Sequence, residues 1–222
     1  CLLSRGLGDV YKRQVLESLY GLGRLQFKEY SITSHYKSWW NLFSEVGLPL
    51  SFPTGGISEV GTELICSKSS IGHLAQSCIR GTYSKPCNSC WKCFRKQTVR
   101  SALGLIPFDP EKTQTLLKSN EVRGKLSQLP ISHENVLIYS FARLDLSKYP
   151  TGFIQRFDNQ DSLQYLGHWY SKSRQFIHER IREFTENRIK SFIGENDQIL
   201  ESQLEGWNNS SRINRLNPLQ LD

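Results

Sequence analysis

The most informative stretch of the chain is CIRGTYSKPCNSCWKC, from Cys78 to Cys93, which contains four cysteines. Their spacing is Cys78-x8-Cys87-x2-Cys90-x2-Cys93. Two residues between cysteines allow the thiolates to converge on one ion, and a tight turn there lets backbone N–H groups bond the sulfurs. Four thiolates complete a tetrahedral coordination sphere. The spacing therefore predicts a closed, structural zinc site at Cys78, Cys87, Cys90 and Cys93.

Other uses of these cysteines stay open at this point. Disulfides are disfavoured because nothing in the chain predicts secretion, and we expect a cytoplasmic protein. A Cys-x2-Cys-x2-Cys run also occurs in iron–sulfur proteins, and a redox pair needs only one Cys-x2-Cys. Cys66 is expected to be a small buried hydrophobic residue. His73 could substitute as a ligand, but a complete set of four cysteines leaves it unneeded.

The charge distribution indicates an anionic partner. The 222 residues carry 28 Lys and Arg against 21 Asp and Glu, a net charge of +7. No acidic residue falls between Leu64 and Phe108. The basic residues in that segment are Lys68, Arg80, Lys85, Lys92, Arg95, Lys96 and Arg100. Either the segment binds phosphate or nucleic acid, or its cations balance a zinc tetrathiolate with a net charge of about −2.

The N-terminal half of the chain alternates predicted helices with extended segments. Apolar residues at helical spacing, together with Ser58 as an N-cap and Gly47 as a helix end, define the helices. The helices are predicted over residues 15–26, 36–46, 58–67, 71–75 and 91–103. Residues 30–33 and 48–53 are predicted to be extended. This alternation predicts an α/β unit with a parallel sheet.

From Asp109 onward the pattern is mainly helical. Asp109-Pro110-Glu111 combines an N-cap, a proline at the first helical position and an acid in the first turn. Further helices are predicted over residues 132–144, 161–170 and 172–193. The last of these carries an apolar stripe made of Phe176, Ile177, Ile181, Phe184, Ile189, Phe192 and Ile193. Such a stripe is typical of a packing face, within the chain or against a second copy in a homodimer.

The domain boundaries are expected near changes of composition. Residues 1–14, CLLSRGLGDVYKRQ, resemble a translated library adaptor, and the chain contains no methionine. We therefore expect a non-native leader over 1–14, with native sequence starting near Val15. An α/β unit over 15–107, a helical extension over 108–194 and a flexible polar tail over 195–222 should follow. No apolar run approaches the ~18 residues needed to span a bilayer, so no membrane contact is expected.

The stretch from Phe52 to Lys96 resembles the C-terminal half of the 7-cyano-7-deazaguanine synthase family. Those proteins are PP-loop ATP pyrophosphatases with an adenine-nucleotide α-hydrolase (HUP-like) fold. The family carries a proline-bearing strand, a helix, a Ser-Cys pair and a Cys-x2-Cys-x2-Cys cluster that holds zinc. Pro53, the helix from Ser58, Ser77-Cys78 and the three following cysteines stand in that order here. The resemblance implies a partial Rossmann-like parallel sheet with a zinc–cysteine cluster, followed by a mainly α-helical extension.

The resemblance also implies a function. It places Gly56, Ser58 and Glu59 near a nucleotide or substrate pocket, and it implies a C–N bond-forming ligase that uses ATP with Mg²⁺ to adenylate a carboxylate before ammonia attacks. The family's Ser-Gly-Gly-x-Asp-Ser loop, which grips ATP, is missing here, and we expect it upstream of Val15. This chain is thus expected to be an inactive fragment of a divergent enzyme that acts on a nucleotide or another small molecule. The alternative hypothesis is a non-catalytic zinc module that binds nucleic acid through residues 64–108.

Overall fold

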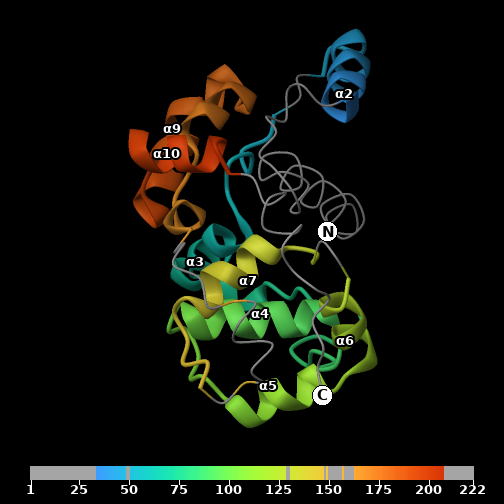
Figure 1. Cartoon of the computed structure of the whole chain (residues 1–222). Helices are drawn as coiled ribbons and strands as arrows, with labels where there is room; N and C mark the ends of the chain where they lie inside the picture. The colour runs from blue at the N-terminus through green and yellow to red at the C-terminus, as the bar shows by residue number, and fades with distance from the viewer. Residues whose placement is uncertain are drawn as a thin grey trace. The chain divides into compact units, whose positions relative to one another are not determined.

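The computed structural model describes residues 34–48, 51–128, 131–147, 149, 157 and 163–207. The chain divides into two compact units (Figure 1). Unit 1 comprises Cys1–Gly61 and Tyr165–Asn209, and unit 2 comprises Thr62–Gln164 and Ser210–Asp222. Unit 2 extends across the boundary expected near residue 107, because helices on both sides of that point pack on each other.

Helices are the regular elements of the described ranges. They are α2 (Ser34–Glu45), α3 (Glu59–Lys68), η2 (Gly72–Leu74), α4 (Trp91–Ala102), α5 (Pro110–Leu117), α6 (Asn120–Leu126), α7 (Glu134–Phe141), η3 (Gln164–Gly167), η4 (Ser171–Phe176), α9 (Glu179–Ile193) and α10 (Gln198–Glu205). None of the described helices has the length and apolar character needed to cross a membrane.

The prediction of an α/β fold with a parallel sheet is wrong for the described residues. Extended pairing there is limited to isolated bridges, Thr82 with Lys85 and Trp169 with Glu195. Residues 51–53 are extended in part, but the Phe52 N–H donates to the Phe176 carbonyl at 2.7 Å instead of joining a ladder. Pro53 has no N–H to offer to a neighbouring strand. The predicted strand over 30–33 and the helix over 15–26 lie outside the described residues.

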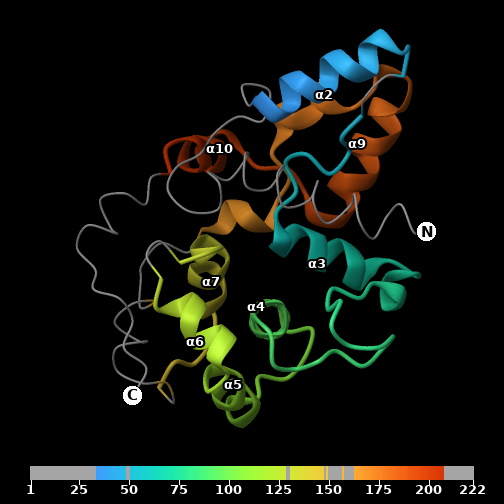
Figure 2. The same cartoon turned by 90° about the vertical axis from the view of Figure 1, so that its right-hand side faces the viewer.

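Unit 2 is built around α4. This helix packs against α5, α6 and α7, and Figure 2 shows it nearly end-on beside them. Phe94 on α4 is fully buried, and its ring centroid lies 6.5 Å from that of Phe141 on α7. Phe141 in turn lies 5.0 Å from Phe157. Burial of each such side chain contributes about 1.5–3 kcal/mol, so these three rings help to hold α4 against α7.

Unit 1 joins the segment around Phe52 to the C-terminal helices. Trp169, fully buried, exchanges backbone hydrogen bonds with Gly194 at 3.2 Å and Asn196 at 2.9 Å. The helix predicted over 172–193 is interrupted, because η4 ends at Phe176 and α9 begins only after His178 caps it. The apolar stripe is therefore divided: Phe176, Ile177, Ile189 and Ile193 are buried, whereas Ile181 and Phe184 are exposed. A homodimer through this stripe stays a prediction.

The polar stretch after Glu195, expected to fray, includes a helix that holds η4. The α10 carboxylate of Glu201 accepts hydrogen bonds from the Ser171 N–H at 2.9 Å and from the Ser171 hydroxyl at 2.6 Å. Glu205, one turn further, accepts from Lys172 at 2.6 Å. These contacts place carboxylates at the N-terminal end of η4, where free N–H groups need acceptors.

Candidate metal centre

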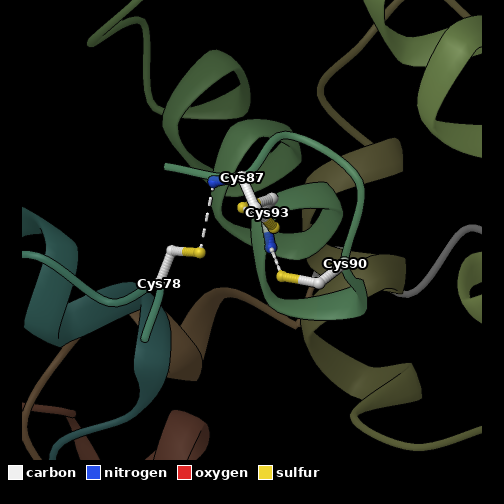
Figure 3. A group of neighbouring side chains, drawn as sticks. All are labelled: Cys78, Cys87, Cys90 and Cys93. Carbon is white, nitrogen blue, oxygen red and sulfur yellow. Dashed lines mark hydrogen bonds between the residues drawn. The ribbon is translucent and has the colours of Figure 1, made fainter. Parts of the chain in front are cut away.

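The four predicted ligands meet in unit 2. Cys78 comes from the loop after η2, Cys87 and Cys90 flank a tight turn, and Cys93 lies in the first turn of α4 (Figure 3). We call Cys78, Cys87, Cys90 and Cys93 the cysteine cluster. All of its Sγ atoms lie within 4.8 Å of one another. The sulfurs of Cys87 and Cys93 are 3.8 Å apart, and a tetrahedral zinc site with Zn–S bonds of about 2.3 Å has edges of about 3.8 Å.

Backbone N–H groups are directed at the sulfurs. The Cys87 N–H donates to Cys78 Sγ at 3.3 Å, and the Cys93 N–H donates to Cys90 Sγ at 3.4 Å, as the dashed lines in Figure 3 show. Asn88 adopts a left-handed conformation with φ of 51°, which the turn between Cys87 and Cys90 requires and asparagine tolerates. Cys90 is also the N-cap of α4, so its sulfur lies at the positive end of the helix dipole. Both features stabilise thiolates.

The four thiols respond differently to their surroundings. Burial is the largest influence on each and raises the pKa, but hydrogen bonds from the Ser89 backbone and side chain lower the pKa of Cys87 to about 6. Bonds from the Cys87 and Arg80 backbones likewise outweigh burial and lower the pKa of Cys78. Burial prevails at Cys90 and Cys93, whose pKa values are raised. Four thiolates this close repel one another, so a bound cation is needed to hold all of them in the ionised form.

This geometry distinguishes between the alternatives left by the sequence. A disulfide would bring two sulfurs to about 2.05 Å, but all four cysteines are free thiols. In a [4Fe–4S] cluster each thiolate binds a different iron, and in a [2Fe–2S] cluster two thiolates bind each iron, so the four sulfurs spread further apart than around a single ion. Sulfurs within 4.8 Å of one another fit a mononuclear site. A redox pair would leave two of the four without a role.

Two further candidate residues lie outside the cysteine cluster. Cys66, on α3, is half-buried, which is more exposed than expected for a core residue. His73, in η2, is exposed and its Nδ1 lies 3.0 Å from the carbonyl of Ser70. Neither belongs to the group that could hold an ion.

Gly56, Ser58 and Glu59 connect parts of unit 1. The Ser58 hydroxyl donates to the Leu166 carbonyl and accepts from the Gly61 N–H at 3.0 Å, so Ser58 caps α3 as predicted. The Gly56 carbonyl accepts from the Tyr170 N–H at 3.0 Å, and Glu59 is buried. These contacts are structural ones, and a nucleotide-binding role for the three residues stays an untested prediction.

Three cations of the acid-free segment have acidic partners that lie outside that segment in the sequence. Lys96 Nζ lies 2.6 Å from a carboxylate oxygen of Glu63 on α3, and Arg100 Nε lies 3.9 Å from its other oxygen. Arg80 forms an ion pair with Glu121 on α6. Three of the seven basic residues are thus engaged by carboxylates, which reduces the charge that they offer to a polyanion.

A glutamine missed in the sequence shapes the loop that carries Cys78. The Gln76 side-chain amide donates to the Cys78 carbonyl at 3.0 Å and to the Thr82 carbonyl at 2.9 Å. Its oxygen accepts from the Ser84 N–H at 2.7 Å. One side chain therefore satisfies three backbone groups of a loop that has little regular structure. An isolated glutamine gives no sequence signal for such a role.

Comparison with known proteins identifies the family but not an activity. The model of a family of unknown function, DUF6395, matches residues 38–208, which include the whole cysteine cluster. No curated protein and no solved structure matches the chain. The helical architecture of the described residues and this family match overturn the resemblance to 7-cyano-7-deazaguanine synthases, and with it the basis for ATP and ligase chemistry. The chain belongs to the family of unknown function DUF6395.

Proposed function

We propose that this protein binds one Zn²⁺ through Cys78, Cys87, Cys90 and Cys93, and that the ion holds unit 2 together. The observation that carries the proposal is the convergence of four thiol sulfurs within 4.8 Å, in a region where backbone N–H groups are directed at two of them. Soft thiolate ligands in a tetrahedral array suit zinc.

A structural role for the zinc is supported by the ligand set. Four protein ligands leave no open position for water or substrate, whereas catalytic zinc sites keep one. Three of the four cysteines are buried, and Cys87 is half-buried. Between Lys68 and Trp91 the regular backbone consists of η2 and the bridge between Thr82 and Lys85. In such a loop the ion substitutes for the apolar core that the segment lacks.

Elemental analysis of the purified protein tests the proposal directly. We expect one zinc per chain, and Co²⁺ substitution should give the absorption of a tetrahedral thiolate site. Cys90→Ser should lose the metal, whereas Cys66→Ser, a cysteine outside the cluster, should keep it. Iron with visible absorbance, or wild-type protein that is purified without any bound metal, would refute the proposal.

Nucleic-acid binding through residues 64–108 is a second candidate function, favoured by the absence of acidic residues in that segment and the net charge of +7. Its support is weaker, because Arg80, Lys96 and Arg100 contact carboxylates. Binding of duplex and single-stranded DNA and RNA, measured by fluorescence anisotropy between 50 and 200 mM salt, tests this second candidate. A slope of log affinity against log salt near −6 would show that most of the segment contacts phosphates. Absence of binding would rule this candidate out.

A further inference from the structure

Glu121, on α6, contacts both halves of the proposed zinc site. One carboxylate oxygen accepts a hydrogen bond from Arg80, which follows Cys78 by two residues. The other accepts from the backbone N–H of Trp91, directly after Cys90, at 3.2 Å. One side chain thus connects the loop of the first ligand to the turn that carries the others.

We propose that Glu121 is a positioning residue for the metal. It holds the Cys78 loop and the start of α4 at the separation that a single ion requires, without itself contacting the ion. The inference rests on the proposed zinc site and extends it from the ligands to the residue that orients them. Residues that orient metal ligands typically contribute 10–100-fold to metal affinity.

The element that carries Glu121 is suited to this task. Val122 and Leu126 on α6 are fully buried, and α6 packs against α4. The residue before α6, Ser119, donates its hydroxyl to the carbonyl of Ser89 at 2.6 Å, inside the turn between Cys87 and Cys90. The N-terminal end of α6, anchored by these buried side chains, therefore forms two hydrogen bonds to the segment that carries Cys87 and Cys90: one to the Ser89 carbonyl and one to the Trp91 N–H.

The contact with Trp91 serves the helix that carries Cys93. The first N–H groups of a helix have no acceptor within the helix. At α4 the Cys93 N–H donates to Cys90 Sγ and the Trp91 N–H donates to Glu121. The carboxylate also lies at the positive end of the helix dipole. Without Glu121 the Trp91 N–H would lose this acceptor, and the first turn of α4, where Cys93 lies, would be less firmly held.

Electrostatic repulsion alone would make Glu121 weaken zinc binding instead of supporting it. A zinc tetrathiolate carries a charge of about −2, so a nearby carboxylate disfavours it. Arg80 offsets this repulsion because its guanidinium interacts with the carboxylate of Glu121 and with the thiolates of Cys87 and Cys90. The Arg80 side chain is 62% exposed, so the ion pair itself contributes little. The effect of Glu121 is therefore expected to come from geometry.

The rate of zinc release tests whether Glu121 acts through geometry or through its charge. The rate of zinc transfer from the full chain to the chelating dye 4-(2-pyridylazo)resorcinol is measured for Glu121→Ala, Glu121→Gln and Glu111→Ala. We expect Glu121→Ala to release zinc at least about tenfold faster. Glu121→Gln should release zinc at a rate between those of the wild type and Glu121→Ala, because its one amide oxygen can still accept from the Trp91 N–H whereas its NH2 group cannot accept from Arg80. Glu111, an exposed acid on α5, is the matched control and should have no effect.

Val122→Ala separates a general loss of stability from a specific effect on zinc release, because it weakens the core of α6 without altering the Glu121 side chain. It should lower the melting temperature while zinc transfer at 25 °C stays near the wild-type rate. Zinc transfer from Glu121→Ala at the wild-type rate, or from Glu121→Gln as fast as from Glu121→Ala, would overturn the inference and leave the zinc site intact. A wild-type protein without metal would instead refute the zinc site itself.

Discussion

Removal of the zinc should lower the free energy of unfolding of unit 2 by roughly 3 kcal/mol. The proposed ion would link Cys78 to Cys93 and close a loop of 16 residues, counting both ends (93 − 78 + 1). The chain-entropy relation for cross-links gives about 3 kcal/mol at 25 °C for a loop of this length. A domain is stable by only about 5–15 kcal/mol, so the metal accounts for a large share. At about 4–8 °C per kcal/mol, the melting temperature should fall by roughly 12–24 °C.

The loss should be concentrated in the loop between α3 and α4. Hydrogen exchange measured by mass spectrometry, with and without a strong chelator, should show lost protection in peptides covering residues 69–90. Peptides from α5, α6 and α7 should be affected less, because their burial comes from the aromatic core around Phe94. Cys66→Ser serves as the control and should behave as the wild type in both states. Equal melting temperatures and unchanged exchange in residues 69–90 after chelation would refute a structural role for zinc.

Two further predictions concern unit 1. Gly56→Ala should destabilise unit 1 by more than about 2 kcal/mol in urea unfolding, because φ is 78° and an added Cβ would lie 2.7 Å from Ser173 Cβ. Gly47→Ala is the control: its φ is 70° but an added Cβ would lie in open space, so it measures the backbone cost alone. Equal losses of stability in the two variants would contradict the steric argument. Hydrogen bonding from Lys172 lowers the pKa of Glu205 below 4.5, so this carboxylate stabilises the fold above that pH and the contribution is lost as the pH falls through the lower, folded value. Glu205→Gln should therefore lose at most about 1 kcal/mol at pH 7, since 35% of the side chain is exposed. This difference from the wild type should shrink as the pH falls below 4.5, and a loss that stays constant with falling pH would argue against the ion pair.

Helix boundaries were predictable where a single local signal sets them. Asp109 accepts a hydrogen bond from the Lys112 N–H at 2.9 Å, as its N-cap pattern predicts. Ser58 caps α3, and Gly47 follows α2 with the positive φ that suits glycine. Each of these residues acts on backbone groups within a few positions of itself. The chemistry of a cap is therefore visible in the sequence without knowledge of the fold.

The sheet and α6 show where such local signals fail. An extended segment becomes a strand only if a partner supplies its hydrogen bonds, and the Phe52 N–H finds a lone acceptor in Phe176. The alternation of helices with extended segments and the resemblance to a sheet-containing family favoured strands, but neither specifies a pairing partner.

The sequence did not predict α6, because that helix has weak local signals. Its seven residues include Gly124, and Ser119 caps it without a side-chain hydrogen bond, so its stability depends on the burial of Val122 and Leu126.

The acid-free segment from 64 to 108 illustrates the same limit for charge. A count within the segment shows seven cations and predicts a phosphate partner. Folding brings Glu63, immediately before the segment, to Lys96 and Arg100, and brings Glu121 to Arg80. A zinc tetrathiolate would offset about two more positive charges. Charge in a sequence window thus overstates the charge available to a ligand when the balancing carboxylates lie outside that window.

The proposed zinc site combines local and long-range contacts, and this explains why its ligands were predictable and the residues that support them were not. A metal needs its ligands at one point in space, and the Cys-x2-Cys-x2-Cys run brings three of them there through local turns, so their spacing is preserved in the sequence. The groups that orient the ligands have no such constraint. Glu121 reaches Trp91 from another helix, and Gln76 reaches three backbone groups across its own loop. Because any helix end or loop of suitable geometry could supply these acceptors and donors, only the fold identifies which residues do so.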